Sequence, residues 1–172
     1  MSLRALLQLT GVAILALLLP GGAGAAPAQD ACLAHGSPTL EEAARRFLEA
    51  LGAGDADALR RLTLSTEEFR NAIWPWLPAS SPRTNLTPEF VWGHYAPRNE
   101  VAFRRLLEAH GGVSYRLVAI EPESERDFAG FQLVVRPVLV VEDPAGAQKR
   151  LQLFGSVIHQ DGRYKVYGFK TD

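Results

Sequence analysis

The sequence predicts an α+β domain in which N-terminal helices pack in the concave face of a curved antiparallel sheet of four or more strands. Three observations indicate this fold class. Apolar residues recur with the 3.6-residue period of a helix between residues 39 and 73. After Gly112 the period becomes 2, which is typical of strands. Short glycine-containing turns separate the later segments, so successive strands are expected to pair antiparallel.

The N-terminus has the three-part pattern of a secretory signal peptide. Arg4 precedes an apolar run over residues 5–19, and Pro20 and a tract of small residues follow. The run is shorter than the roughly 20 residues that span a bilayer, which favours a cleaved signal over a permanent membrane span. Cleavage after Ala25 and cleavage after Ala28 both fit the small-residue rule. We therefore predict an exported protein that is periplasmic or secreted.

Cys32 is the single cysteine of the chain, so no intramolecular disulfide can form. Lipid attachment at Cys32 is not favoured, because the polar residues Gln29 and Asp30 come shortly before it. The chain is expected to divide into three segments. These are a signal peptide over 1–28, a flexible lead over 29–38 and one domain over 39–172.

Three helices are expected in the first half of the domain. Thr39, with a glutamate three residues later, predicts a capped helix that ends at Gly52. Asp55 caps a second, short helix. Ser65 begins a third, which must stop near Pro75 because the residue before a proline avoids helical angles.

Residues 74–99 combine five prolines with all three tryptophans of the chain. Within this segment, Thr87 followed by Pro88 predicts the start of a short helix. A separate, longer helix is expected over residues 99–110, ended by Gly111 and Gly112.

Four strands are expected after Gly112, each bounded by a turn signal. Asp161 and Gly162 form the strongest two-residue hairpin signal. Pro137 and Gly155 predict bulges or bends within two long strands. The expected strands span residues 113–119, 128–141, 148–159 and 164–169.

Two segments carry a family resemblance. Residues 47–62 read FLEALGAGDADALRRL and residues 161–166 read DGRYKV. With the order of elements, they resemble the NTF2-like superfamily, also grouped as SnoaL-like or cystatin-like folds, in an exported bacterial form. The resemblance implies a cone of helices wrapped by a sheet. That superfamily includes isomerases, dehydratases, cyclases, transport adaptors and secretion components, so it does not select one activity. The proline-rich segment 74–99 is longer than the corresponding connection of the family.

Charge and motifs exclude several classes of partner. The formal net charge of −1 implies no basic face, so nucleic acid is not expected as a partner. The four histidines are isolated in sequence, and no metal site is predicted. No glycine-rich phosphate loop or catalytic cysteine motif is present, and no cofactor is expected.

Candidate site residues lie mainly between residues 74 and 95. Expected ligand-binding residues are Trp74, Trp76, Trp92, Tyr95 and Arg136. The candidates for catalysis are His94 or Glu89 as a base and Tyr95 as a proton donor. Within the expected strands, carboxylates such as Glu121 and Glu142 lie only at strand ends, which weakens the enzyme interpretation.

Three functions follow from this pattern, and the first is preferred. The chain is expected to be an exported, non-enzymatic binding module for a small apolar or amphipathic ligand or a protein partner. The alternatives are an enzyme of the isomerase, dehydratase or cyclase type, and a structural or dimerising envelope protein that pairs through the outer face of its sheet. A homodimer is left open.

Overall fold

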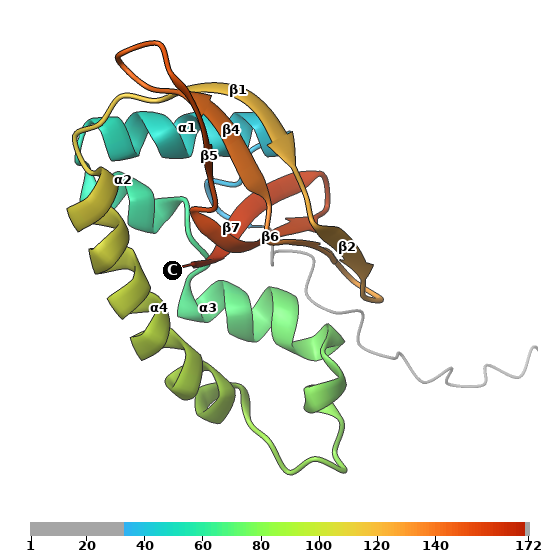
Figure 1. Cartoon of the computed structure of the whole chain (residues 1–172). Helices are drawn as coiled ribbons and strands as arrows, with labels where there is room; N and C mark the ends of the chain where they lie inside the picture. The colour runs from blue at the N-terminus through green and yellow to red at the C-terminus, as the bar shows by residue number, and fades with distance from the viewer. Residues whose placement is uncertain (1–32, 171–172) are drawn as a thin grey trace, which may run out of the picture.

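The structure is a computed structural model that describes residues 33–170 (Figure 1). The predicted signal peptide, its two cleavage sites and Cys32 lie outside the described residues. Within the described range, no helix combines the length and apolar character that crossing a membrane requires.

The predicted helix caps in the first half of the domain are present. The Thr39 hydroxyl accepts a hydrogen bond from the N–H of Glu42, and the Asp55 carboxylate accepts one from the N–H of Ala58. Ser65 and Glu68 form a complete capping box. The helical elements are α1 (Leu40–Gly52), α2 (Ala56–Arg61), α3 (Thr66–Glu68), the π-helix η1 (Phe69–Ile73), the 3-10 helices η2 (Trp74–Trp76) and η3 (Pro78–Ser80), and α4 (Pro88–His110).

The two helices predicted between residues 87 and 110 are one helix, α4, capped by Thr87. The prediction of two separate helices was wrong, because α4 continues through Pro97. Proline removes one backbone hydrogen bond and crowds the preceding turn, which ends most isolated helices. In α4 both halves are held by tertiary contacts: Tyr95 packs on Tyr167 before the proline, and Phe103 packs on Phe169 after it.

The second half of the domain forms two antiparallel sheets, which confirms the α+β class. One sheet has the order β1-β4-β5 and the other the order β2-β3-β6-β7. The strands are β1 (Arg116–Glu121), β2 (Ser124–Asp127), β3 (Gln132–Val135), β4 (Val138–Glu142), β5 (Gln148–Leu151), β6 (Phe154–Gln160) and β7 (Arg163–Phe169).

Each of the two long predicted strands is divided between the two sheets. The first breaks at Arg136, which has a φ of +44° and precedes Pro137. The second breaks between Leu151 and Phe154, and the pairing of β6 with β7 is irregular around Gly155. The bends expected at Pro137 and Gly155 are therefore present. Asp161 and Gly162, with φ values of +49° and +70°, make the predicted tight turn.

The four-stranded sheet has an apolar cluster on each face. Val166 of β7 belongs to the first core, whereas Tyr167, the next residue, packs against the second core. Successive strand residues point to opposite faces, so the two clusters lie on opposite sides of the sheet. The first core joins α1, α2, α4 and both sheets around Phe47, Leu51, Leu59, Phe103, Leu139 and Phe154. The second core contains Leu33, Leu64, Phe69, Ala72, Ile73, Phe131 and Ile158.

Residues 33–38, the described part of the predicted N-terminal lead, pack against the domain. Leu33 is buried in the second core. Ser37 is 1% exposed, and its backbone N–H and C=O both pair with Tyr164 of β7. Thr63 forms a parallel bridge with Val166 of the same strand. The outer edge of β7 is therefore partly covered, which protects it from pairing with another chain.

Candidate functional site

Four half-buried rings on the outside of the second core are linked by aromatic contacts, three of them directly and Trp74 through the buried ring of Phe69. We call Trp74, Trp92, Tyr95 and Tyr167 the aromatic surface. The Tyr95 and Tyr167 rings are stacked, with centroids 4.7 Å apart and planes 8° apart. Trp92 lies 5.4 Å from Tyr95 and 4.7 Å from the buried ring of Phe69, which also contacts Trp74. The structure thus brings together three of the predicted ligand-binding residues.

Hydrogen bonds hold two of these rings, Trp92 and Tyr95, in place. The indole N–H of Trp92 donates to Thr66 Oγ1 at 2.8 Å, and the Tyr95 hydroxyl donates to the Tyr167 carbonyl at 2.9 Å. Gly168 makes room for Tyr95, because a Cβ at Gly168 would lie 1.7 Å from that hydroxyl. The surface is therefore formed before any ligand arrives.

Trp76 lies apart from this stack, since no ring contact joins it to the other four side chains in the described chain. Its indole covers Gly130, where a Cβ would lie 2.2 Å from Trp76 Cε2. Gln160 supports the same loop by donating from Nε2 to the carbonyls of Ala72 and Gly130, both at 3.1 Å.

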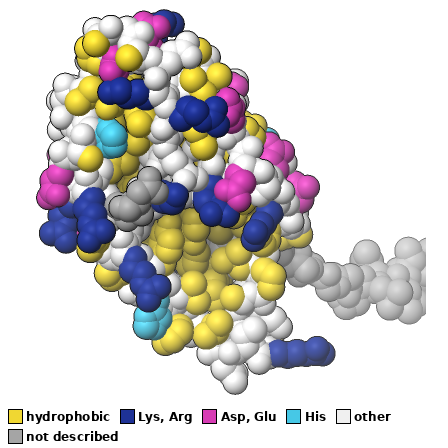
Figure 2. Space-filling model, in the orientation of Figure 1, with side chains coloured by type: hydrophobic (Ala, Val, Ile, Leu, Met, Phe, Trp, Pro, Cys, Tyr) yellow, Lys and Arg dark blue, Asp and Glu magenta, His cyan; other side chains and the backbone are white. Residues whose placement is uncertain are grey.

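Exposed apolar side chains accompany the aromatic surface in the same part of the chain. Phe90 is 55% exposed, Leu86 is 40% exposed and Trp76 is 37% exposed. In Figure 2 hydrophobic side chains form a broad area where α3 and α4 lie in Figure 1, and Lys and Arg side chains border it. A contiguous apolar area of this kind is typical of a binding surface.

Arg136 does not join this surface. It lies at the bend between β3 and β4, and its guanidinium donates to Glu123 Oε1 at 2.7 Å in an exposed ion pair. Its position outside the strand interior follows from the break at Pro137, which alternation along one long strand did not reveal.

The three catalytic candidates form no hydrogen bond with one another among the described residues. Glu89 pairs with Arg70 at 2.9 Å; its own backbone N–H, followed by Arg70, lowers the pKa of its exposed carboxyl. His94 is exposed and contacts Phe90 edge-on. Burial raises the pKa of Tyr95, whose hydroxyl is already engaged by a carbonyl. In this arrangement neither candidate base, Glu89 or His94, has the Tyr95 hydroxyl beside it as a proton donor.

Sequence reasoning missed a buried ion pair on the same face of β7 as Tyr167. Lys165 is 3% exposed, and its Nζ donates to Glu68 Oε1 and Oε2 at 2.7 and 2.8 Å and to the Ala34 carbonyl at 2.6 Å. Glu68 also accepts from the backbone N–H groups of Ala34 and Ser65. All three ammonium hydrogens therefore have acceptors.

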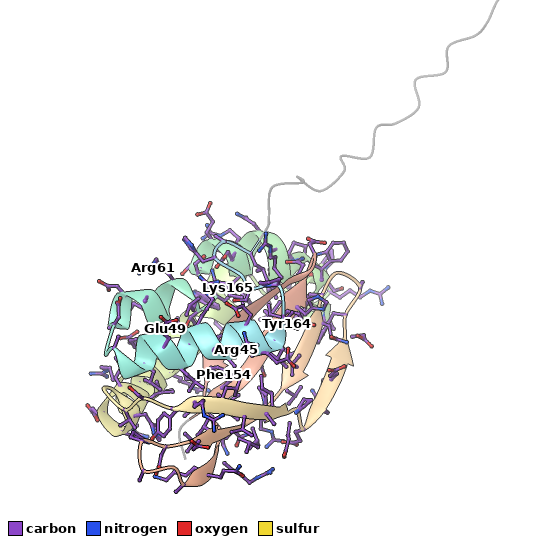
Figure 3. The ribbon with its side chains drawn as sticks, turned by 90° about the horizontal axis from the view of Figure 1, so that it is seen from above. Arg45, Glu49, Arg61, Phe154, Tyr164 and Lys165 are labelled. Carbon is purple, nitrogen blue, oxygen red and sulfur yellow. The ribbon has the colours of Figure 1, made fainter. Side chains whose placement is uncertain are left out.

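A hollow of about 470 Å³ lies beside this pair. We call it the arginine hollow; Figure 3 shows Arg61 of α2 and Lys165 of β7 on the same side of α1. Its volume is in the range of small-molecule sites. The lining residues are Ala34, His35, Arg60, Arg61, Thr63, Ser65, Glu67, Glu68, Asn71 and Lys165.

The π-helix η1 connects the hollow with the aromatic surface. Phe69, at its first position, stacks on Trp92, and Asn71, two residues later, lines the hollow. Widened turns of this kind are rare and are frequent at functional sites. Apart from the capping box before it, no local pattern in the sequence predicts η1.

In residues 33–170 no three His, Cys, Asp or Glu side chains gather as a metal site. Comparison with models of protein families, with curated proteins and with solved structures found no match to this chain. The resemblance to the NTF2-like superfamily therefore stays a prediction.

Proposed function

We propose that this protein is an exported, non-enzymatic binding module that holds a small apolar or amphipathic ligand on the aromatic surface. One observation carries the proposal. Trp92, Tyr95 and Tyr167 form a continuous row of ring contacts, Trp74 joins it through Phe69, and all four rings stay half-buried beside the buried residues of the second core.

The stack favours binding because its geometry is set in advance. Ordering a free side chain at an interface costs about 0.5–1.5 kcal/mol. The hydrogen bonds of Trp92 and Tyr95 have already met that cost here. A ligand that covers the half-exposed rings removes further apolar area from water, at about 25 cal/mol per Å². The Lys and Arg border seen in Figure 2 favours an amphipathic ligand with an anionic head.

Tryptophan fluorescence tests this proposal, because all three tryptophans lie in residues 74–92. The protein is titrated with monomeric oleate and, separately, with the neutral apolar probe naphthalene. We expect a saturable change in emission with at least one of them. The variant Trp92→Leu should weaken binding about tenfold or more, since it removes the ring between Phe69 and Tyr95.

The matched control is Val118→Ser, which changes an apolar side chain that is 45% exposed on β1, away from the second core. It should bind as the unaltered protein does. Circular dichroism checks that both variants are folded. The proposal is rejected if neither probe changes the emission, as expected of a protein-partner surface, or if both variants lose binding equally.

No contact among the described residues specifically supports the two alternative functions, an enzyme or a structural or dimerising protein. Glu89, His94 and Tyr95 are not arranged as an acid and a base, so no observation favours an isomerase, dehydratase or cyclase. At one sheet edge, the exposed strand β2 carries Glu125, Arg126 and Asp127, which disfavours edge-to-edge strand pairing between copies. Dimerisation through the outer face of a sheet, the form of the alternative given above, is a separate arrangement that no contact in the described residues specifically favours.

A further inference from the structure

The arginine hollow contains a cation that the protein itself leaves unsatisfied. Arg61 lines this hollow and also a neighbouring one of about 300 Å³, and within residues 33–170 it makes no hydrogen bond or ion pair. The five N–H donors of its guanidinium therefore have no acceptor among the described residues. A planar guanidinium matches carboxylate and phosphate groups in a bidentate geometry.

Three other charged side chains of the hollow, Arg60, Lys165 and Glu68, are already engaged. Arg60 donates to Glu100 at 2.7 Å, and its guanidinium carbon lies 4.6 Å from the centre of the Phe103 ring. Lys165 and Glu68 neutralise each other. Arg60 thus adds a positive field from a constrained position, while Arg61 stays free to bind.

Two further polar side chains in the hollow also lack partners in the described chain. The Asn71 amide and the Glu67 carboxylate line it without a hydrogen bond of their own. Asn71 can donate to an anion beside Arg61, whereas Glu67 can only accept. The set therefore suits a ligand that combines an anionic group with a hydrogen-bond donor.

We propose that the arginine hollow binds a small molecule carrying an oxyanion, either a carboxylate or a phosphate, together with a hydroxyl or amino group. Arg61 and Asn71 hold the oxyanion, and Glu67 accepts from the donor. The site differs in residues from the aromatic surface, so it stands or falls independently of the apolar ligand.

Nuclear magnetic resonance titration tests the site directly, because the Arg61 Nε–H and the Asn71 amide report on it. The protein is titrated with glycolate as the carboxylate probe and with glycerol 3-phosphate as the phosphate probe, at constant ionic strength. Glycerol serves as the uncharged control. We expect saturable shifts of the Arg61 and Asn71 signals with at least one anionic probe and none with glycerol.

Two variants sharpen the result. Arg61→Ala should weaken binding about tenfold or more, because it removes a charge-assisted hydrogen bond pair. Asn71→Asp should weaken it as well, since a carboxylate then faces the anion. Both side chains are exposed, so both variants should fold. Arg104→Ala, on the exposed face of α4 and outside the hollow, is the matched control and should bind normally.

The outcomes separate cleanly. Loss of binding in Arg61→Ala and Asn71→Asp but not in Arg104→Ala supports the site. Absence of shifts with both probes, or equal binding in all three variants, overturns it. A positive result here with no change in tryptophan emission on adding oleate or naphthalene would leave this site standing and reject the apolar one.

Discussion

The two faces of the four-stranded sheet differ in how completely their aromatic side chains are buried. On the first, Phe47 is fully buried, and its ring meets Phe154 edge-on at 4.8 Å beneath α1. On the second, Tyr95 and Tyr167 stack just as closely but remain half-exposed. The first core is closed by helices over both sheets, whereas the second is capped by short helical turns and the first half of α4.

This difference indicates that one face of the sheet mainly stabilises the fold, whereas the other face remains able to bind a ligand. Burial of apolar area stabilises a fold only when water is excluded from it. Rings that are ordered but half-exposed add less to the fold and remain able to bind. We therefore expect the first core to contribute most of the free energy of unfolding. The second face should tolerate substitutions at its surface but not in the buried Lys165–Glu68 ion pair, which we call its polar anchor.

A pair of phenylalanine variants provides the largest contrast. Phe47→Ala should lower the free energy of unfolding by about 3–5 kcal/mol, because it leaves a cavity in the first core. Phe90→Ala, at a ring that is 55% exposed, should change it by about 0.5 kcal/mol or less. Urea denaturation measures both. Similar losses in the two variants would contradict the division between the faces.

The polar anchor of the second face is tested by Lys165→Met. This change leaves the Glu68 carboxylate, 11% exposed, without its cation, which should cost about 3 kcal/mol or more. Lys149→Met is the control, because Lys149 is 50% exposed in its pair with Asp143 whereas Lys165 is 3% exposed, so the loss for Lys149→Met should be clearly smaller. Chemical denaturation compares them, and a smaller loss for Lys165→Met than for Lys149→Met would refute the anchor.

Two glycines test how tightly α4 is seated on the second face. Gly168→Ala places a methyl group against the Tyr95 hydroxyl and should destabilise the fold by about 1–3 kcal/mol. Gly93→Ala, with open space around it in α4, should stabilise by about 0.5–1 kcal/mol. Thermal unfolding reports both signs. If Tyr95→Phe does not recover part of the Gly168→Ala loss, the close contact is not its cause.

The smallest expected effect is a pH dependence at the C-terminal end of α4. Burial, followed by the charge of Lys149, lowers the pKa of His110 below its usual 6.5. The unfolded chain then binds the proton more readily, so this contribution to stability is complete above about pH 6.5 and is lost as the pH falls through the lower, folded pKa. His110→Gln should flatten this slope in urea midpoints measured across that window, whereas Val101→Ala should leave it unchanged.

Local patterns predicted the parts of the fold that depend on nearby residues. Thr39, Asp55 and Ser65 cap helices as expected, because each bonds to a backbone group three residues away. The Asp161 and Gly162 turn also forms as expected. Local patterns did not predict that one helix continues through Pro97, because the contacts that hold both halves of α4 come from β7, far along the chain.

The candidate site was predicted only in part, for the same reason. The aromatic composition of residues 74–95 pointed to Trp74, Trp92 and Tyr95, which do meet. Arg136 was misplaced because alternation cannot show where a strand breaks. The arginine hollow was not predicted at all, since it joins the N-terminal lead, α2, η1 and β7.

The sequence by itself determined the α+β class, the helix caps and the tight turn, because these depend on propensity and on hydrogen bonds between near neighbours. Only the tertiary structure decided that the strands split into two sheets, that Lys165 meets Glu68 across 97 residues, and that one face of the four-stranded sheet stays partly open. Such contacts depend on how faces pack together, and strand register selects which side chains reach each face.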